Sequence, residues 1–120
     1  MTRPRITLKR AYEPPSPDDG LRILVERLWP RGLTKAAAAI DHWPKDVAPT
    51  PGLRTWYGHR PERWNEFAGR YRTELACNED AVAALRKLIA DHRRVTFVFA
   101  AKDEARNGAV VLRDYLMSMG

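Results

Sequence analysis

The stretch Val95-Thr96-Phe97-Val98-Phe99-Ala100-Ala101 decides the fold of this 120-residue chain. It is β-branched and aromatic almost throughout, a composition typical of a strand. The stretch is apolar on both faces, so it suits a central strand that is covered by helices on each side. The sequence therefore predicts a sheet built around residues 95–101.

Two more strands are predicted upstream of this central one. Residues 5–9 alternate basic with apolar or β-branched side chains, as a half-buried strand does. Residues 21–28 contain the apolar run 23–25 and end where Pro30 and Gly32 force a turn. A short additional strand is expected at residues 40–43, because Pro44 follows and stops it.

Helices are expected between and after the strands, because capping residues precede several apolar-periodic segments. The expected starts are Thr34, Thr50-Pro51, Pro61, Asn78 and Asp103. Gly58 supplies a stop for the helix that begins at Thr50. The helix opened by Pro61 carries one apolar stripe, and the last helix is expected to reach about Met117.

These segments predict one compact, layered α/β domain over residues 1–120. Its sheet is expected to be small, mainly parallel or mixed, and flanked by helices. The chain contains no repeat, low-complexity segment or internal linker that would divide it.

The composition favours a soluble protein with anionic partners. Lysine and arginine number 21 against 15 acidic residues, giving a net charge of +6. That surplus favours phosphorylated metabolites, nucleotides, nucleic acid or acidic proteins. The charge is spread along the chain and forms no block of like charges, so it is a weak preference and no DNA-binding signature.

A cytoplasmic location is expected. No apolar run approaches the length of a membrane span, and the N-terminus lacks the apolar region of a signal peptide. Cys77 is the only cysteine, which excludes an internal disulfide framework, and the three histidines are far apart. We therefore expect neither a metal site nor a cofactor.

Ligands of open α/β sheets gather beyond the carboxyl ends of the strands, at the turns into helices. Several basic and polar residues have that predicted position, and helix starts next to them accept phosphate or carboxylate. The expected ligand-binding residues are Arg27, Trp29, Arg31, Lys45, Thr50, Arg54, Lys102 and Asn107. The expected acid/base residues are His59, which lies beside arginines, and Asp103.

Each of these residues also has a purely structural interpretation. Arg27 and Arg31 could pair with Glu26 or Asp41 and only tie the turn together. Trp29 and the other tryptophans are more often packing residues than stacking platforms. Lys102 could be a solvated loop charge, Asp103 a helix cap and His59 a cap as well.

The sequence resembles the YeaO-like family of small bacterial proteins, a group with a domain of unknown function (DUF488). The resemblance rests on four segments in matching order that cover nearly the whole chain: residues 12–20 (YEPPSPDDG), 27–33 (RLWPRGL), 56–64 (WYGH followed by PERW) and 100–104 (AAKDE). It implies an α/β fold and a cytoplasmic, bacterial setting, and it carries no assigned activity. Asn107 matches the family pattern. Glu26 stands where members commonly have aspartate, and Gly108 where they often have histidine.

The leading hypothesis is a domain that binds a small anionic molecule, such as a nucleotide or phosphorylated metabolite, and that could be an enzyme. In that hypothesis the basic side chains hold the anion and stabilise developing charge. The alternatives are a nucleic-acid-associated module, which no motif supports, and a non-catalytic protein-interaction domain. The sequence leaves the reaction type and the oligomeric state open.

Overall fold

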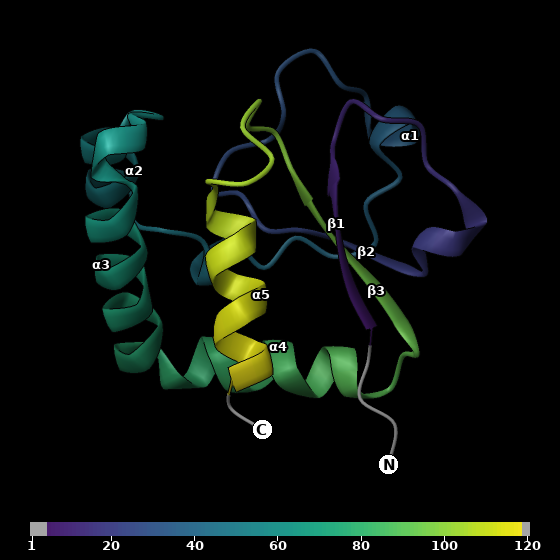
Figure 1. Cartoon of the computed structure of the whole chain (residues 1–120). Coiled ribbons are helices and arrows are strands. Elements are labelled where there is room, and N and C mark those ends of the chain that lie inside the picture. The colour runs from purple at the N-terminus through teal and green to yellow at the C-terminus, as the bar shows by residue number, and fades with distance from the viewer. Residues whose placement is uncertain (1–4, 119–120) are drawn as a thin grey trace.

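Three parallel strands form the centre of the computed structural model, which describes residues 5–118 (Figure 1). They are β1 (Arg5–Arg10), β2 (Leu21–Leu24) and β3 (Arg94–Phe99), in the order β1-β3-β2. Both neighbours pair with β3 in parallel. The prediction of a central strand within residues 95–101 is therefore confirmed, although the strand ends at Phe99, and the α/β class is confirmed as well.

Helices supply most of the remaining structure. The α-helices are α1 (Lys35–Ala38), α2 (Pro51–Tyr57), α3 (Trp64–Cys77), α4 (Glu79–Ala90) and α5 (Gly108–Ser118), and the short 3-10 turns are η1 (Pro17–Asp19), η2 (Lys45–Val47) and η3 (Pro61–Arg63). The Thr34 hydroxyl accepts a hydrogen bond from the Ala37 N–H at the start of α1. Thr50 caps α2, and Gly58 ends it in a left-handed conformation with φ of 53°. These caps confirm the sequence signals at both helices.

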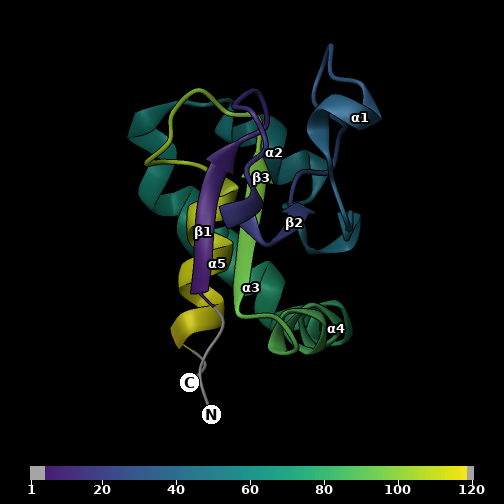
Figure 2. The same ribbon diagram turned by 90° about the vertical axis from the view of Figure 1, so that its right-hand side faces the viewer.

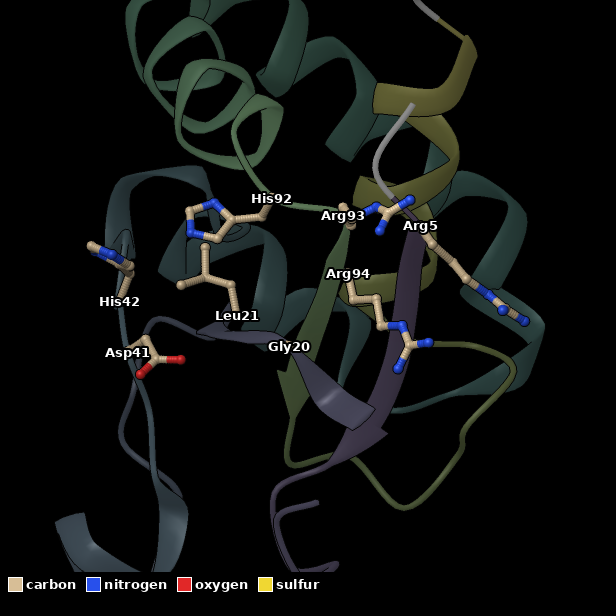
Figure 3. A pocket seen from close by; sticks show the side chains of 8 residues that line it. All are labelled: Arg5, Gly20, Leu21, Asp41, His42, His92, Arg93 and Arg94. Carbon is tan, nitrogen blue, oxygen red and sulfur yellow. The ribbon is translucent and has the colours of Figure 1, made fainter. Parts of the chain in front are cut away.

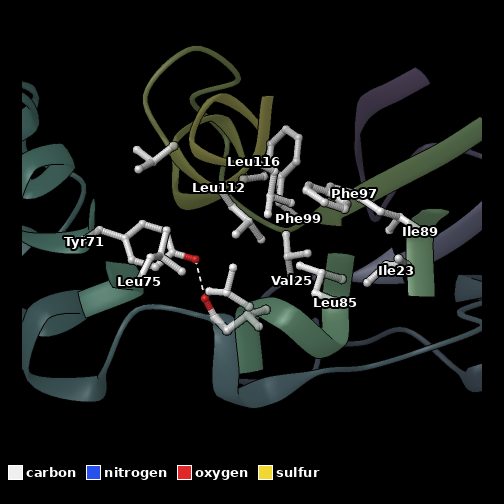
Figure 4. Close-up of a cluster of buried hydrophobic side chains, with 14 of the residues drawn as sticks. Ile23, Val25, Tyr71, Leu75, Leu85, Ile89, Phe97, Phe99, Leu112 and Leu116 are labelled. Carbon is white, nitrogen blue, oxygen red and sulfur yellow. Dashed lines mark hydrogen bonds between the residues drawn. The ribbon is translucent and has the colours of Figure 1, made fainter. Parts of the chain in front are cut away.

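One face of the sheet is covered by the longer helices. Phe97 and Phe99 of β3 pack there with Ile23 of β2 and with buried side chains of α3, α4 and α5 (Figure 4). The stripe predicted on α3 lies in this core, where Tyr71 is 1% exposed and its hydroxyl donates a hydrogen bond to the Val47 carbonyl. Figures 1 and 2 show α5 beside the sheet, with α4 crossing near the strand starts.

The opposite face of the sheet has a different cover. Leu24 and Val98, which are partners in the ladder, are completely buried there against the segment that connects β2 to α2. The partly buried side chains that pack on them are Trp29, Leu33, Ile40 and Trp43. The expectation of helices on each side is thus only partly right: on this face a loop with two indoles and one helical turn replaces a long helix.

Two predicted strand boundaries are wrong. Strand β2 ends at Leu24 instead of continuing to residue 28, although the Val25 N–H still donates to the Val98 carbonyl. Residues 40–43 make one isolated bridge, between Ile23 and His42, in place of a strand. The ladder is interrupted because the Asp41 side chain accepts the Arg22 N–H at 2.9 Å.

The start of α5 also differs from prediction. Asp103 does not cap it, because the helix begins at Gly108 and the Asn107 side chain accepts the Val110 N–H at 3.1 Å. Gly108 fits closely there, since a Cβ would lie 3.3 Å from the Pro49 ring. Asn78 makes no side-chain cap on α4, because its amide instead donates to the Asp46 carbonyl. Cys77 at the end of α3 is exposed.

A buried ion pair ties the second cover to the sheet. Arg22 is 4% exposed and its guanidinium donates to the Asp19 carboxylate at 2.6 Å. The same guanidinium also donates to the carbonyls of Ala38 and Ala39 at the end of α1. Lys9 forms a second ion pair with Asp19 at 3.1 Å. Since every buried polar side chain among the described residues has a partner, this polar cluster is fully satisfied.

The ion pair makes the free energy of unfolding depend on pH in the acid range. Burial alone would raise the pKa of Asp19, but the Ser16 N–H, Lys9 and Arg22 together lower it. When folding lowers the pKa of an acid, its ionised form stabilises the fold at every pH above the unfolded-state pKa, which is about 3.9 for aspartate. This contribution is lost as the pH falls through the lower, folded-state pKa. We therefore expect the free energy of unfolding from urea titrations to fall as the pH drops below about 4.

Asp19→Asn should remove this dependence and also cost stability at neutral pH. Losing one partner of a buried pair costs about 3–5 kcal/mol, because the remaining charges are left without a counter-ion. Asp18→Asn is the matched control, because its ion pair with Arg94 joins two exposed side chains. Equal losses in the two variants would contradict the structural role given to Asp19.

Candidate functional site

The carboxyl ends of the strands meet at one edge of the sheet, called here the carboxyl edge (residues 10–12, 25–27 and 100–103). Glu26 follows β2, and its half-buried carboxylate accepts the Ala100 N–H at 3.2 Å. Arg10 ends β1, and its guanidinium donates to the carbonyls of Ala101 at 3.0 Å and Ala100 at 3.4 Å. The turn after β3 is therefore held from both neighbouring strands.

The end of α2 lies close to this edge. The Tyr57 hydroxyl donates to the Arg106 carbonyl at 3.0 Å and joins α2 to the loop after β3. Burial raises the pKa of Glu26, while the Ala100 N–H, His59 and Arg54 act in the opposite direction. Glu26 thus lies within electrostatic reach of two residues that the sequence predicted for the site.

The loop between β3 and α5 organises its own polar groups. The Asp103 carboxylate accepts the N–H groups of Ala105 and Arg106, both at 3.0 Å, and pairs with the Arg106 side chain at 3.4 Å. The Ala105 N–H, the strongest influence, lowers the pKa of Asp103, and Arg106 adds to the effect. Asn107 is 3% exposed and donates to the Asp103 carbonyl. Lys102 is exposed beside this loop.

The predicted residues after β2 have several environments. Arg27 donates to the carbonyls of Pro49 at 3.2 Å and Ala48 at 3.0 Å, and it pairs with no carboxylate of residues 5–118. The Trp29 indole donates to the Leu33 carbonyl and packs edge-on against Trp43, with ring centroids 5.4 Å apart. The Arg31 side chain is exposed, and its carbonyl accepts the Tyr12 hydroxyl.

Lys45 and Thr50 lie in other contacts. The Lys45 ammonium lies 4.1 Å from the centroid of the Trp43 ring. Thr50 donates to Glu74 through both its hydroxyl and its N–H, in addition to capping α2. Thr50 also lines a cavity of about 390 Å³ together with Trp56, Arg70 and Glu74.

Tyr57, which lies between Arg54 and His59 in the chain, thus contacts the loop that holds Asp103, and Glu26 contacts the start of the same loop, while Lys45, Thr50 and Trp29 have other neighbours. Sequence reasoning missed Glu26 and Arg10 as members of this edge. The signal was available, because both are charged residues at or directly after strand ends. The sequence indicates Glu26 only as an ion-pair partner of Arg27 or Arg31 and as a departure from the family pattern.

A larger cavity lies at the opposite edge of the sheet, and sequence reasoning missed it. Its volume is about 1030 Å³, and Figure 3 shows the side chains that line it. The residues that line this amino-edge cavity are Arg5, Gly20, Leu21, Asp41, His42, His92, Arg93 and Arg94. Gly20 has φ of 65°, and a Cβ there would lie 2.2 Å from the Arg94 carbonyl, so only glycine fits this wall.

Among residues 5–118, no cluster of three or more histidine, cysteine, aspartate or glutamate side chains could hold a metal ion. None of the helices described is long and apolar enough to cross a membrane.

Comparison with known proteins places the chain in a family. It is 47% identical over 112 residues to uncharacterised proteins of Mycobacterium tuberculosis and Mycobacterium bovis, covering 93% of each chain. It is 39% identical over 114 residues to the uncharacterised protein YeaO of Escherichia coli, covering 95% of this chain and 98% of YeaO. No solved structure matches it significantly. Residues 5–119 match the family described as the inactive DUF488-N3 subclade, so the chain belongs to this YeaO-like branch of the DUF488 family.

Proposed function

We propose that this protein binds a small anionic molecule at the carboxyl edge of its sheet and does not transform it. A nucleotide or a phosphorylated metabolite is the ligand class that suits the basic surplus of the chain. The observation that carries the proposal is the contact of Tyr57, which lies between Arg54 and His59 in the chain, with the loop after β3, because Ala100 at the start of that loop donates its N–H to Glu26. Segments distant in the sequence contribute polar groups to one surface there.

Uncommitted cations support the proposal. Arg31, Arg54 and Lys102 are exposed, and none of them has an ion-pair partner within residues 5–118. Arginine offers a planar fork that matches phosphate and carboxylate oxygens. Arg27 and Arg106 are different: the Arg27 guanidinium already donates to two carbonyl groups, and the Arg106 guanidinium already pairs with Asp103. We therefore assign the anion contacts to Arg54, His59 and Lys102, with Arg31 at the periphery.

Binding without turnover agrees with the state of the two predicted acid/base residues. A general base works best when its pKa lies near the operating pH. The pKa of Asp103 is lowered, and two backbone N–H groups already hold its carboxylate. His59 is exposed and has no hydrogen-bonded partner among the described residues that would orient it. The description of the matching subclade as inactive points in the same direction.

The remaining predicted contacts are outside this narrower proposal. Arg27, Thr50 and Asn107 use their polar groups to join parts of the fold. Lys45 and Trp29 contact Trp43. Their ligand-binding roles stay predictions from the sequence, as does the cytoplasmic location.

Arg54→Ala and His59→Ala test the proposed site. Wild-type protein is screened by thermal shift against inorganic phosphate, pyrophosphate, AMP and citrate, and the probes that stabilise it are titrated by calorimetry. Loss of a charge-assisted contact should weaken binding about tenfold or more in Arg54→Ala, because such contacts contribute roughly 1.5–3 kcal/mol. Arg72→Ala is the matched control, since this exposed arginine carries the same charge and belongs to α3, which contributes no residue to the proposed site.

Equal weakening in Arg54→Ala and Arg72→Ala would contradict the proposal, because it would show a general charge effect. Stabilisation by none of the probes would contradict it as well. Gel-shift binding of an oligonucleotide that weakens steeply with salt, in the absence of small-anion binding, would favour the nucleic-acid alternative instead.

Glu26→Gln tests the electrostatics of the same edge. Burial raises the pKa of Glu26, so the protonated carboxyl group is the form that favours the folded state. Its contribution to the free energy of unfolding is present below the unfolded-state pKa and is lost as the pH rises through the folded-state pKa. Glutamine can still accept the Ala100 N–H. The variant should therefore be at least as stable as wild type at pH 7, lose that advantage near pH 4, and bind the anionic probes more tightly. Weaker anion binding by a stable Glu26→Gln would contradict the assignment.

A further inference from the structure

The amino-edge cavity has a charge pattern that the carboxyl edge does not share. Arg5 and Arg94 begin β1 and β3 and are direct partners in the parallel ladder. Directly opposed like charges destabilise a sheet. Arg93 precedes Arg94, and its carbonyl accepts the Arg5 N–H at 2.9 Å. The structure therefore places three arginines at the start of two neighbouring strands, and all three line the amino-edge cavity.

The protein itself neutralises this charge poorly. Arg94 pairs with Asp18 at 3.2 Å, but the two side chains are 59% and 88% exposed, so solvent weakens the pair. Arg5 and Arg93 have no ion-pair partner within residues 5–118. A bound anion with several oxygens would relieve the repulsion, because guanidinium groups bind phosphate oxygens in a bidentate manner.

The opposite wall of the cavity has another character. Asp41 and His42 lie there, separated from the arginines by Leu21 (Figure 3). One oxygen of Asp41 accepts the Arg22 N–H, which fixes the carboxylate and leaves its other oxygen available. The C-terminal end of α4, with its partial negative charge, comes close to this wall through His92. This wall suits a group that donates hydrogen bonds.

His92 adds a ring nitrogen to the cavity. Its Nδ1 lies 3.1 Å from the Leu88 carbonyl. A carbonyl only accepts hydrogen bonds, so Nδ1 carries the proton, and in the neutral ring Nε2 is left as an acceptor. Leu21 supplies an apolar surface between the two polar walls. The cavity volume of about 1030 Å³ exceeds what a bare phosphate group needs and suits a small organic molecule.

We propose that the amino-edge cavity is a second binding site, independent of the carboxyl edge, for a diphosphate ester whose organic part carries hydrogen-bond donors. Arg5, Arg93 and Arg94 hold the phosphates. Asp41 and His92 receive the donors of the organic part, which lies over Leu21. A nucleoside diphosphate has this chemistry, and inorganic pyrophosphate represents its charged half alone.

Calorimetric titration with ADP, inorganic pyrophosphate and adenosine tests the site. Wild type should bind ADP more tightly than pyrophosphate, and adenosine should bind at least tenfold more weakly than ADP. Arg5→Ala and Arg94→Ala should each weaken ADP and pyrophosphate about tenfold or more. Asp41→Asn keeps an acceptor for the Arg22 N–H, and it should weaken ADP while leaving pyrophosphate unchanged. Arg86→Ala, an exposed arginine of α4, is the charge-matched control.

Variants of the two edges separate the two proposals. Arg54→Ala should leave ADP binding at the amino-edge cavity unchanged, and Arg5→Ala should leave the carboxyl edge unchanged. Wild-type ADP affinity in both Arg5→Ala and Arg94→Ala would overturn the second site, as would an equal loss in Arg86→Ala. Thermal melts of each variant confirm folding, and Arg5→Lys, which keeps the charge without the fork, should retain only part of the affinity if the variant with alanine proves unstable.

Discussion

Strand β3 must be buried on both of its faces, and the rest of the structure follows from this constraint. Phe97 and Val98 point to opposite faces, and both are 0% exposed. Full burial requires a neighbour on each side of the strand and a cover on each face. The neighbours β1 and β2 run parallel to β3, so all strand starts meet at one edge and all strand ends at the other. Charged residues that flank the strands are gathered at the two edges as a result.

Different combinations of interactions hold the two covers against the sheet. Apolar packing of α3, α4 and α5 covers the face of Phe97 and follows the helical stripes. The cover over Val98 is thin, and it is attached through hydrogen bonds of the buried Arg22 to the end of α1. Such a polar attachment fixes geometry, because its donors and acceptors must all be satisfied at once. This attachment also explains how a short chain buries both faces of β3 although the longer helices cover only one face of the sheet.

Sequence was informative wherever local chemistry decides the outcome. The unbroken apolar run of β3, the Thr50-Pro51 start of α2 and its Gly58 stop each have a direct physical cause. Prediction failed where two residues compete for the same role. Asp103 and Asn107 can both cap a helix, and Asp103 is instead used by the turn before it. The bridge at His42 likewise depends on Asp41 taking the Arg22 N–H, which no local pattern reveals.

The candidate sites show the same division. Ligands of open α/β sheets bind beyond the carboxyl ends of the strands, so the sequence could predict Arg54 and His59 as residues of a site there. The amino-edge cavity could not be predicted, because the pairing of Arg5 with Arg94 depends on strand register, and the sequence alone does not define register. Single arginines at ordinary loop positions carry no signal until the fold places them side by side.

The parallel sheet collects charged residues at its two edges, and we propose that small anions bind at both. Amide NMR spectra recorded during a titration with ADP test this most directly. Two separate groups of resonances should shift, one at residues 20–21, 41–42 and 92–94 and one at residues 26, 54–59 and 100–103, and the two groups should saturate at different ADP concentrations. Shifts scattered evenly over exposed lysines and arginines, without saturation at either edge, would contradict it.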